Sequence, residues 1–123
     1  MGFISNPADP GAALTVAETE VFNGTSPIAW TDLDLSAIVG ANRALVLLKV
    51  GNPATTIYGT ALRRNGDVDE SYNASSHGAS KASFGGVSLF MHAVMATDAA
   101  GIIEWRAGAA VAGVTIDVVA YIK

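Results

Sequence analysis

The sequence predicts an all-β protein, an antiparallel β-sandwich with jelly-roll-like topology. Short segments of alternating apolar and polar residues recur along the 123 residues, and Gly, Asn, Asp or Pro clusters separate them. No segment keeps the 3.6-residue period of an amphipathic helix for three turns. Hydrophobic residues make up 50% of the chain, enough for a buried core in one domain of this size.

The first half of the chain contains four predicted strands and one helical turn. We expect strands over residues 13–22, 28–35, 43–50 and 55–62. Asn23-Gly24 indicates a turn after the first strand. The segment 43–50 is the most continuously apolar and is therefore predicted to be central. Ser36 and Gly40 suit the start and the end of a single helical turn between strands.

The second half begins with a predicted tight turn at Asn65-Gly66 and a long polar surface loop over residues 67–83. Gly85-Gly86 is interpreted as a bulge before the next strand. Further strands are expected over residues 87–97, 102–107 and 114–123, which gives seven or eight strands in all. Strict alternation places two residues of the segment 102–107 inward, Ile103 and Trp105. It places five residues of the last strand on one face: Val114, Ile116, Val118, Ala120 and Ile122.

Composition excludes several classes of partner and site. The formal net charge is −4 and the only basic pair, Arg63-Arg64, precedes acidic residues, so no nucleic-acid partner is expected. No apolar stretch reaches the ~20 residues of a membrane-spanning helix, and no secretion signal is recognisable. The chain has no cysteine, which excludes disulfides and thiolate metal sites. High apolar content with only 15% charged residues predicts a homo-oligomer, since some apolar side chains would face another subunit.

Residues 1–12 are predicted to form an N-terminal arm preceding a single sandwich domain over residues 13–123. Pro7 and Pro10, with nearby glycines, interrupt regular structure in this segment. Phe3 and Ile4 are the side chains with which such an arm would hold a neighbouring surface. These four residues are therefore the candidate contacts between the arm and a neighbouring subunit.

Catalytic and metal-binding patterns are weak in this sequence. The acidic cluster Asp67-Val68-Asp69-Glu70 lacks the ligand spacing of a calcium loop and is interpreted as a solvated segment. His77 and His92 stand apart from other ligands, and His92 is expected to be partly buried in its strand. Asp32 and Asp34 share one strand face and are expected to point to solvent. We therefore expect no enzyme activity, no cofactor and no metal.

A carbohydrate-binding platform is the competing interpretation, because sugars stack on aromatic faces. The candidate rings come from both halves of the chain: Trp30, Tyr58, Tyr72, Trp105 and Tyr121. Trp105 alternates with Ile103 and is expected to fill the core, whereas Tyr72 lies in the long predicted loop. Tyr72 and His77 are therefore the candidate exposed contacts for a glycan.

Five segments together resemble small β-sandwich structural proteins of tailed bacteriophages. They are WTDLDL at 30–35, NRALVLLKV at 42–50, RNGD at 64–67, TDAAGIIEW at 97–105 and VTIDVVAYI at 114–122. The resemblance covers most of the chain from Trp30 onward and lies in the overall pattern, with no single diagnostic motif.

The resemblance implies a virion component, most like a capsid decoration (cement) protein. Such proteins commonly form trimers and bind the major capsid protein or other virion subunits at capsomer junctions, often with an N-terminal arm. It implies synthesis in the host cytoplasm, a final location on the capsid surface and no catalytic residues. Related sandwiches also serve in tail fibres, so a glycan- or receptor-binding module is the alternative.

Overall fold

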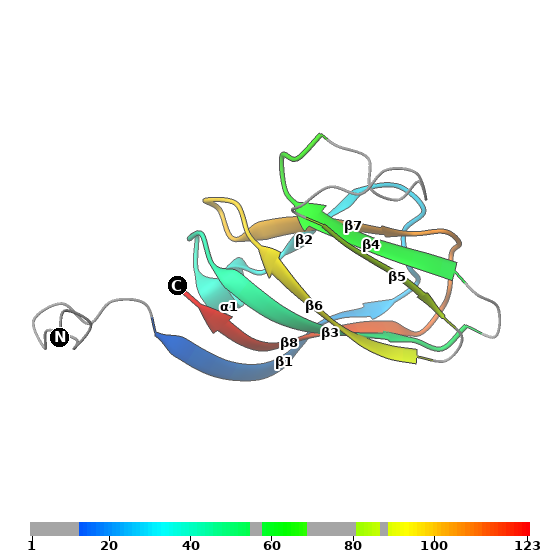
Figure 1. Ribbon diagram of the computed structural model, residues 1–123, viewed down its shortest axis with the longest axis horizontal. Coiled ribbons are helices and arrows are strands. Elements are labelled where there is room, and N and C mark those ends of the chain that lie inside the picture. Colours follow the sequence, from blue (N-terminus) through cyan, green and yellow to red (C-terminus); the bar gives the residue numbers. More distant parts are fainter. Residues whose placement is uncertain (1–12, 55–57, 69–80, 87–88) are drawn as a thin grey trace, which may run out of the picture.

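The computed structural model describes residues 13–54, 58–68, 81–86 and 89–123, which form two facing antiparallel sheets (Figure 1). Sheet A contains, in spatial order, β1 (Leu14–Gly24), β8 (Val114–Ile122), β3 (Leu45–Asn52) and β6 (Leu89–Ala96). Sheet B contains β2 (Thr31–Asp34), β7 (Ile102–Ala107), β4 (Tyr58–Arg64) and β5 (Lys81–Gly86). The predicted all-β sandwich is confirmed.

The strand pairing is that of a jelly roll. β1 pairs with β8, β2 with β7, β3 with β6 and β4 with β5, all antiparallel, so the chain folds back on itself as one long ribbon. The pairs β3–β8 and β4–β7 then join neighbouring turns of that ribbon into the two sheets. Eight strands wound in this way form the double Greek key of a jelly roll.

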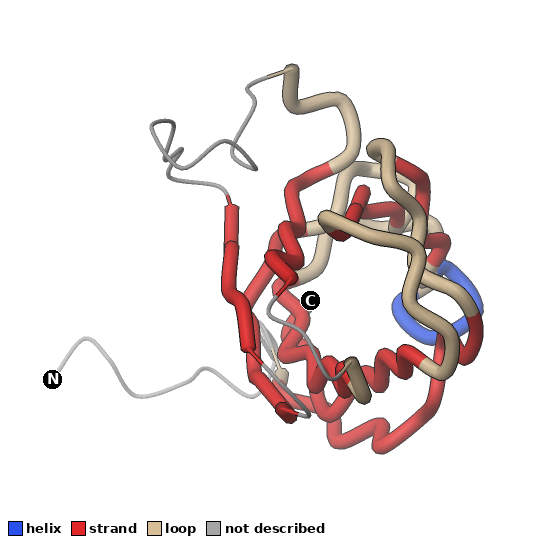
Figure 2. Tube along the Cα trace, turned by 90° about the vertical axis from the view of Figure 1, so that its right-hand side faces the viewer, coloured by secondary structure: helices blue, strands red, loops and turns tan. Residues whose placement is uncertain are grey.

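The core lies between the two sheets, where both contribute their inward residues (Figure 2). Alternation along β3 and β8 buries Val46, Leu48, Ile116 and others from sheet A. Sheet B contributes the largest core side chain, Trp105, which is 1% exposed as predicted. The edge of the Phe22 ring meets the Trp105 ring with centroids 4.8 Å apart and planes at 71°, a favourable aromatic geometry that ties β1 to β7.

The predicted helical turn is present as α1 (Ser36–Val39). Leu35, and not Ser36 as expected, occupies the N-cap position, and the Ser36 N–H at the first helical position donates to the Asp34 carboxylate at 2.9 Å. Gly40 closes the turn with φ 73°, as expected. In the part of the chain that the structure describes, no helix is long or apolar enough to cross a membrane.

Three local expectations are wrong because strand pairing overrides turn preferences. Asn23-Gly24 does not form a turn; both residues extend β1 and pair with Thr115 and Val114. Residues 81–83, expected in a loop, belong to β5. Gly85 and Gly86 also belong to β5, pairing with β4, and do not form the expected bulge. Glycine and asparagine are poor strand formers, but a partner strand with open hydrogen-bonding groups outweighs that preference.

Turns at one end of the sandwich are joined by buried polar side chains. Thr97, 2% exposed, donates its hydroxyl to the Asn42 carbonyl at 2.9 Å and accepts from the Ala44 N–H at 2.9 Å. The Thr97 N–H donates to the Ala44 carbonyl. Together these bonds tie the end of β6 to the start of β3.

Asp98 holds the turn between β6 and β7 together. One of its carboxylate oxygens accepts the N–H groups of Ala100 and Ile102 at 2.9 Å, and the other accepts the Asn65 amide at 2.8 Å. Burial raises the pKa of Asp98, but the hydrogen bonds from Ile102, Asn65 and Ala100 outweigh burial and lower its pKa below the ordinary value. The charged carboxylate is thus favoured by the fold.

Asp98→Asn is expected to reduce the acid sensitivity of folding. Because the pKa of Asp98 is lower in the folded state, its stabilisation is complete above the unfolded pKa of about 3.9 and is lost as pH falls through the folded value. Urea unfolding of both proteins between neutral and strongly acidic pH should show their free energies of unfolding converging toward low pH. If the difference in free energy of unfolding between the two proteins stays constant with pH, this role of Asp98 is contradicted.

Candidate interaction surface

The outer face of sheet A carries two complete rows of apolar side chains. Paired residues of neighbouring strands point to the same face of a sheet, so the strand registers define the rows. One row is Leu14, Ile122, Leu45 and Ala96, and the next is Val16, Ala120, Leu47 and Val94. These eight residues, two from each strand, are called the apolar face below.

Much of the apolar face is open to solvent. The exposed fractions are 68% for Leu14, 66% for Val16, 58% for Val94, 45% for Leu45 and 39% for Ile122. A shallow hollow of about 250 Å³ lies among side chains of this face. Contiguous apolar patches beyond a few hundred Å² on a monomer mark interaction sites. The apolar face is therefore the candidate functional surface.

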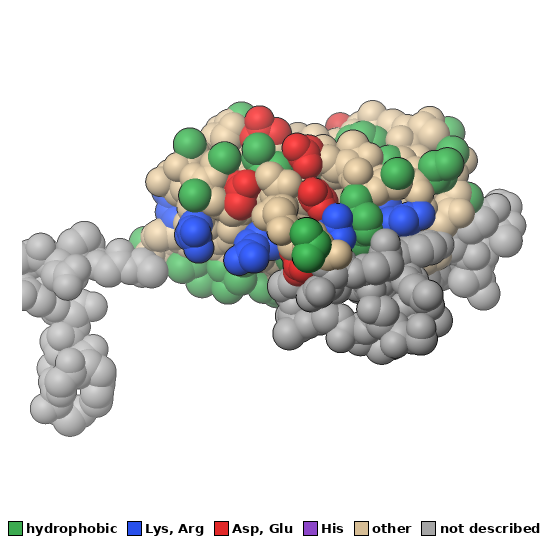
Figure 3. Space-filling model, turned by 90° about the horizontal axis from the view of Figure 1, so that it is seen from above, with side chains coloured by type: hydrophobic (Ala, Val, Ile, Leu, Met, Phe, Trp, Pro, Cys, Tyr) green, Lys and Arg blue, Asp and Glu red, His purple; other side chains and the backbone are tan. Residues whose placement is uncertain are grey.

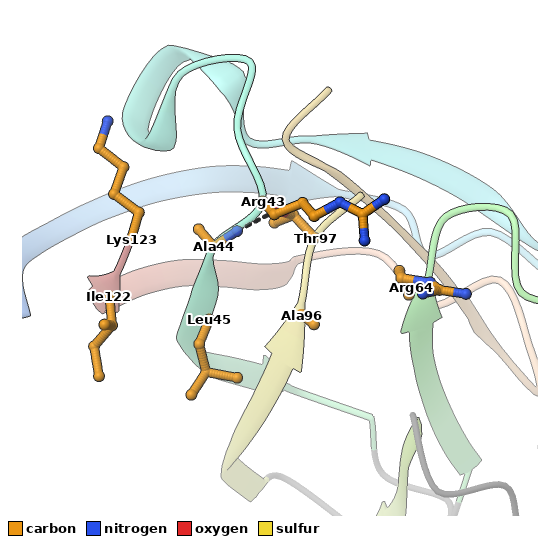
Figure 4. A pocket seen from close by; sticks show the side chains of 8 residues that line it. All are labelled: Arg43, Ala44, Leu45, Arg64, Ala96, Thr97, Ile122 and Lys123. Carbon is orange, nitrogen blue, oxygen red and sulfur yellow. Dashed lines mark hydrogen bonds between the residues drawn. The ribbon is translucent and has the colours of Figure 1, made fainter. Parts of the chain in front are cut away.

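A second hollow, of about 360 Å³, adjoins one end of this face and is lined by Arg43, Arg64 and Lys123 among others. Figure 4 shows Leu45 and Ile122 pointing to one side of the strands and Lys123 to the other. The Lys123 ammonium donates to the Val39 carbonyl at 3.0 Å. Lys123 thus supports the end of α1, while the apolar side chains turn outward beside it.

Two strand irregularities create this face. Leu47 pairs with Ala120 but Leu48 pairs with Val118, so Val119 is an extra residue that bulges from β8. In β1 the register shifts between Val16 and Thr19, where Glu18 has φ 47°.

The bulge overturns the expected alternation in the last strand. Of the five residues expected to share one face of this strand, only Val114, Ile116 and Val118 point into the core. Past Val119 the side chains change face, which turns Ala120 and Ile122 outward and packs Tyr121 against the core. A one-residue insertion thus moves two apolar residues to the outer face of sheet A, where Ile122 is 39% exposed and Ala120 stays covered by its neighbours.

A polar row borders the apolar face. The registers align Glu20 of β1, Asp117 of β8, Lys49 of β3 and His92 of β6 across the sheet. His92 is exposed, contrary to the expectation of partial burial, because the outer face of sheet A is uncovered at β6. The order of charge along this row is negative, negative, positive and then histidine.

Phe90 lies beyond the polar row and is also exposed, by 66%. Its ring covers Gly51 on the neighbouring strand, where an added Cβ would lie 2.7 Å from the Phe90 Cε1 atom. The Lys49 ammonium lies 4.5 Å from the centre of the ring. The Phe90 ring therefore packs on its own sheet, and the polar row lies between it and the apolar face.

The outer face of sheet B has a different character. Glu104 pairs with Arg63 in an ion pair, and the Arg63 guanidinium stacks over the Trp30 ring at 4.0 Å. Asp32 and Asp34 are exposed, as expected. Figure 3, which views the molecule from the side of β7 and β4, shows acidic and basic side chains interspersed on that surface. Of the eight large apolar side chains that are exposed in the described part of the chain, six lie on sheet A.

Among the candidate rings whose side chains the structure describes, three do not form a carbohydrate platform, and the side chain of Tyr58 lies outside that part. Trp105 is buried, Tyr121 packs against the core, and one face of Trp30 is occupied by Arg63. Tyr72 lies outside the described residues, so its proposed glycan contact stays a prediction.

All the other predicted contact residues also lie outside the described residues. These are His77 and the arm residues Phe3, Ile4, Pro7 and Pro10. Among the residues that the structure does describe, no three His, Asp or Glu side chains group as metal ligands would. The apolar face was not predicted residue by residue; the signal for it was the excess of apolar residues over what a small monomer buries.

No family model matches the chain, and neither a curated protein nor a solved structure shows significant similarity to it. Its function is therefore inferred from the fold and from the chemistry of its surface.

Proposed function

We propose that the chain is a non-enzymatic structural protein of a virion, a decoration protein that binds the outer capsid surface and stabilises the head. It acts as a homo-oligomer, and its partners are the major capsid protein or other virion subunits at capsomer junctions. The proposal starts from the resemblance to structural proteins of tailed phages. The observation that supports it best is the apolar face of sheet A, because a subunit with this surface gains stability by association.

The position of the chain ends suits the predicted arm. Leu14 pairs with Ile122, so the start of β1 and the end of β8 lie at the same end of sheet A, as Figure 1 shows. Residues 1–12 precede this point directly. The point at which such an arm is attached lies beside the apolar face, because Leu14 at the start of β1 is itself part of that face.

Deletion of residues 1–12 is expected to weaken capsid binding at least tenfold without unfolding the domain. The described core and both sheets are built from residues after position 13, so their burial is independent of the arm. Binding can be measured by co-sedimentation with undecorated heads of the phage or prophage whose genome encodes the chain, and folding by thermal melting.

The substitution Phe3→Ser with Ile4→Ser provides the matched variant, since it keeps the length of the arm and removes its apolar side chains. It should bind as weakly as the deletion. Full binding by both variants would contradict the role of the arm. A gene located away from any viral structural genes would contradict the proposed function itself.

A further inference from the structure

We infer that the apolar face of sheet A joins two copies of this chain in a two-fold symmetric dimer. The symmetry axis runs parallel to the strands and lies between β8 and β3. The inference specifies how the homo-oligomer of the proposed function assembles, and it does not depend on capsid binding. It also replaces the trimer that the resemblance implies with a dimer as the unit of assembly.

The axis follows from the strand order β1-β8-β3-β6. When two such sheets pack face to face about an axis parallel to the strands, the strand order of the second copy runs in the opposite direction across the interface. β8 then faces β3 of the second copy, and β1 faces β6 of the second copy. Each row of side chains meets the same row of the other copy, so apolar residues meet apolar residues and polar residues meet polar residues.

The polar row becomes complementary under this operation. Asp117 of β8 lies opposite Lys49 of the second copy, and Lys49 lies opposite the second Asp117. Glu20 of β1 lies opposite His92 of the second copy. Two-fold symmetry requires a surface that complements itself, and this row meets the requirement at all four of its positions.

Two of the four facing pairs in the apolar rows combine a large with a small side chain, while a third pair, Ile122 and Leu45, joins two large side chains. Leu47 lies opposite Ala120, the smallest side chain of its row, and Leu14 lies opposite Ala96. Alternating large and small side chains lets facing sheets interdigitate at the ~10 Å spacing of packed sheets. The pair Val16 and Val94 is matched in size.

The alternative two-fold axis, in the sheet plane but perpendicular to the strands, lacks this fit. This axis reverses the order of the rows in the second copy. The polar row of each copy would then lie opposite an apolar row of the other, or beyond the edge of the interface. Asp117 and Lys49 of different copies would then not meet. The charge pattern therefore selects the axis parallel to the strands.

Light scattering of the full-length protein after size exclusion tests the dimer directly. We expect twice the mass of one chain, and Val94→Lys should weaken the dimer by roughly 100-fold or more because it buries an unpaired charge in the interface. Val94 is 58% exposed in one chain, so folding should be unaffected. Ile28→Lys is the matched control, since Ile28 is 60% exposed but lies away from the apolar face. The control should remain a dimer.

A charge exchange tests the position of the axis. Asp117→Lys and Lys49→Asp each place like charges across the proposed interface and should each give monomers. In a mixture of the two variants, the lysine introduced at position 117 of one chain would face the aspartate introduced at position 49 of the other, so a heterodimer should form. The like charges within each chain are unchanged by mixing, so recovery reports contacts between chains alone.

The outcomes separate the possibilities. A wild-type dimer that Val94→Lys dissociates and that the mixed variants restore supports the inference. A wild-type monomer or trimer overturns it, as does a dimer that Val94→Lys leaves intact or a mixture that stays monomeric. A wild-type monomer would also contradict the homo-oligomer of the proposed function. Capsid binding is not measured in any of these experiments and keeps its own test.

Discussion

Trp105→Ala is expected to lower the free energy of unfolding by about 3–5 kcal/mol, the range seen when a buried Trp or Phe is truncated. Trp105 is 1% exposed and contacts the Phe22 ring, so truncation leaves a cavity between the two sheets. Small domains have only ~5–15 kcal/mol of stability in total, so this one change would remove a large share. Urea unfolding followed by far-ultraviolet circular dichroism measures the loss.

Val68→Ala serves as the control for Trp105, because Val68 is 89% exposed and its truncation should change stability by less than about 0.5 kcal/mol. Trp105→Phe should fall between the two, since a smaller ring still fills part of the site. A loss below about 1 kcal/mol for Trp105→Ala would mean that this side chain is not central to the core.

Gly101→Ala is expected to cost at least about 2 kcal/mol, because conformational strain and a steric clash act together. Gly101 has φ 81°, a left-handed conformation that costs a residue with a Cβ roughly 1–2 kcal/mol. An added Cβ would also lie 2.4 Å from the Gly40 carbonyl oxygen and 3.2 Å from the Ser36 Cα, so the turn and α1 would have to separate. The Gly101 carbonyl also accepts the Leu35 N–H at 2.9 Å, a bond that this movement would strain.

Gly66→Ala separates the two causes. Gly66 has φ 85°, almost the same conformation, but an added Cβ there would meet nothing within 4 Å. Its substitution should cost only the conformational part, about 1–2 kcal/mol. Thermal melting of the two variants should therefore place Gly101→Ala clearly below Gly66→Ala. Equal melting temperatures would show that the contact with α1 contributes nothing.

Local sequence patterns were sufficient to predict the sandwich and several of its elements. β7 matches its expected residues at both ends, and Ile103 and Trp105 are buried while Glu104 and Arg106 lie on the other face. The continuous apolar run of β3 correctly predicted a strand with neighbours on both sides. These features depend on the two-residue period of a strand, which is visible in the sequence wherever one face is buried.

The apolar face could be predicted only in part. The excess of apolar residues indicated that some would face outward, but periodicity placed Ala120 and Ile122 on the wrong face, and His92 was expected to be less exposed than it is. The identity of the exposed row depends on the bulge at Val119, which has no glycine, proline or other local signal.

Short-range periodicity and turn chemistry suffice to predict the fold class, the buried face of β7 and the turns at Asn65-Gly66 and Asp98–Gly101. Local patterns do not predict three other features, which exist only in the folded chain: the register of β8, the inclusion of residues 81–86 in a strand and the alignment of Asp117 with Lys49. Those features arise from hydrogen bonds between strands far apart in the chain. A single bulged residue there reverses which side chains meet the solvent.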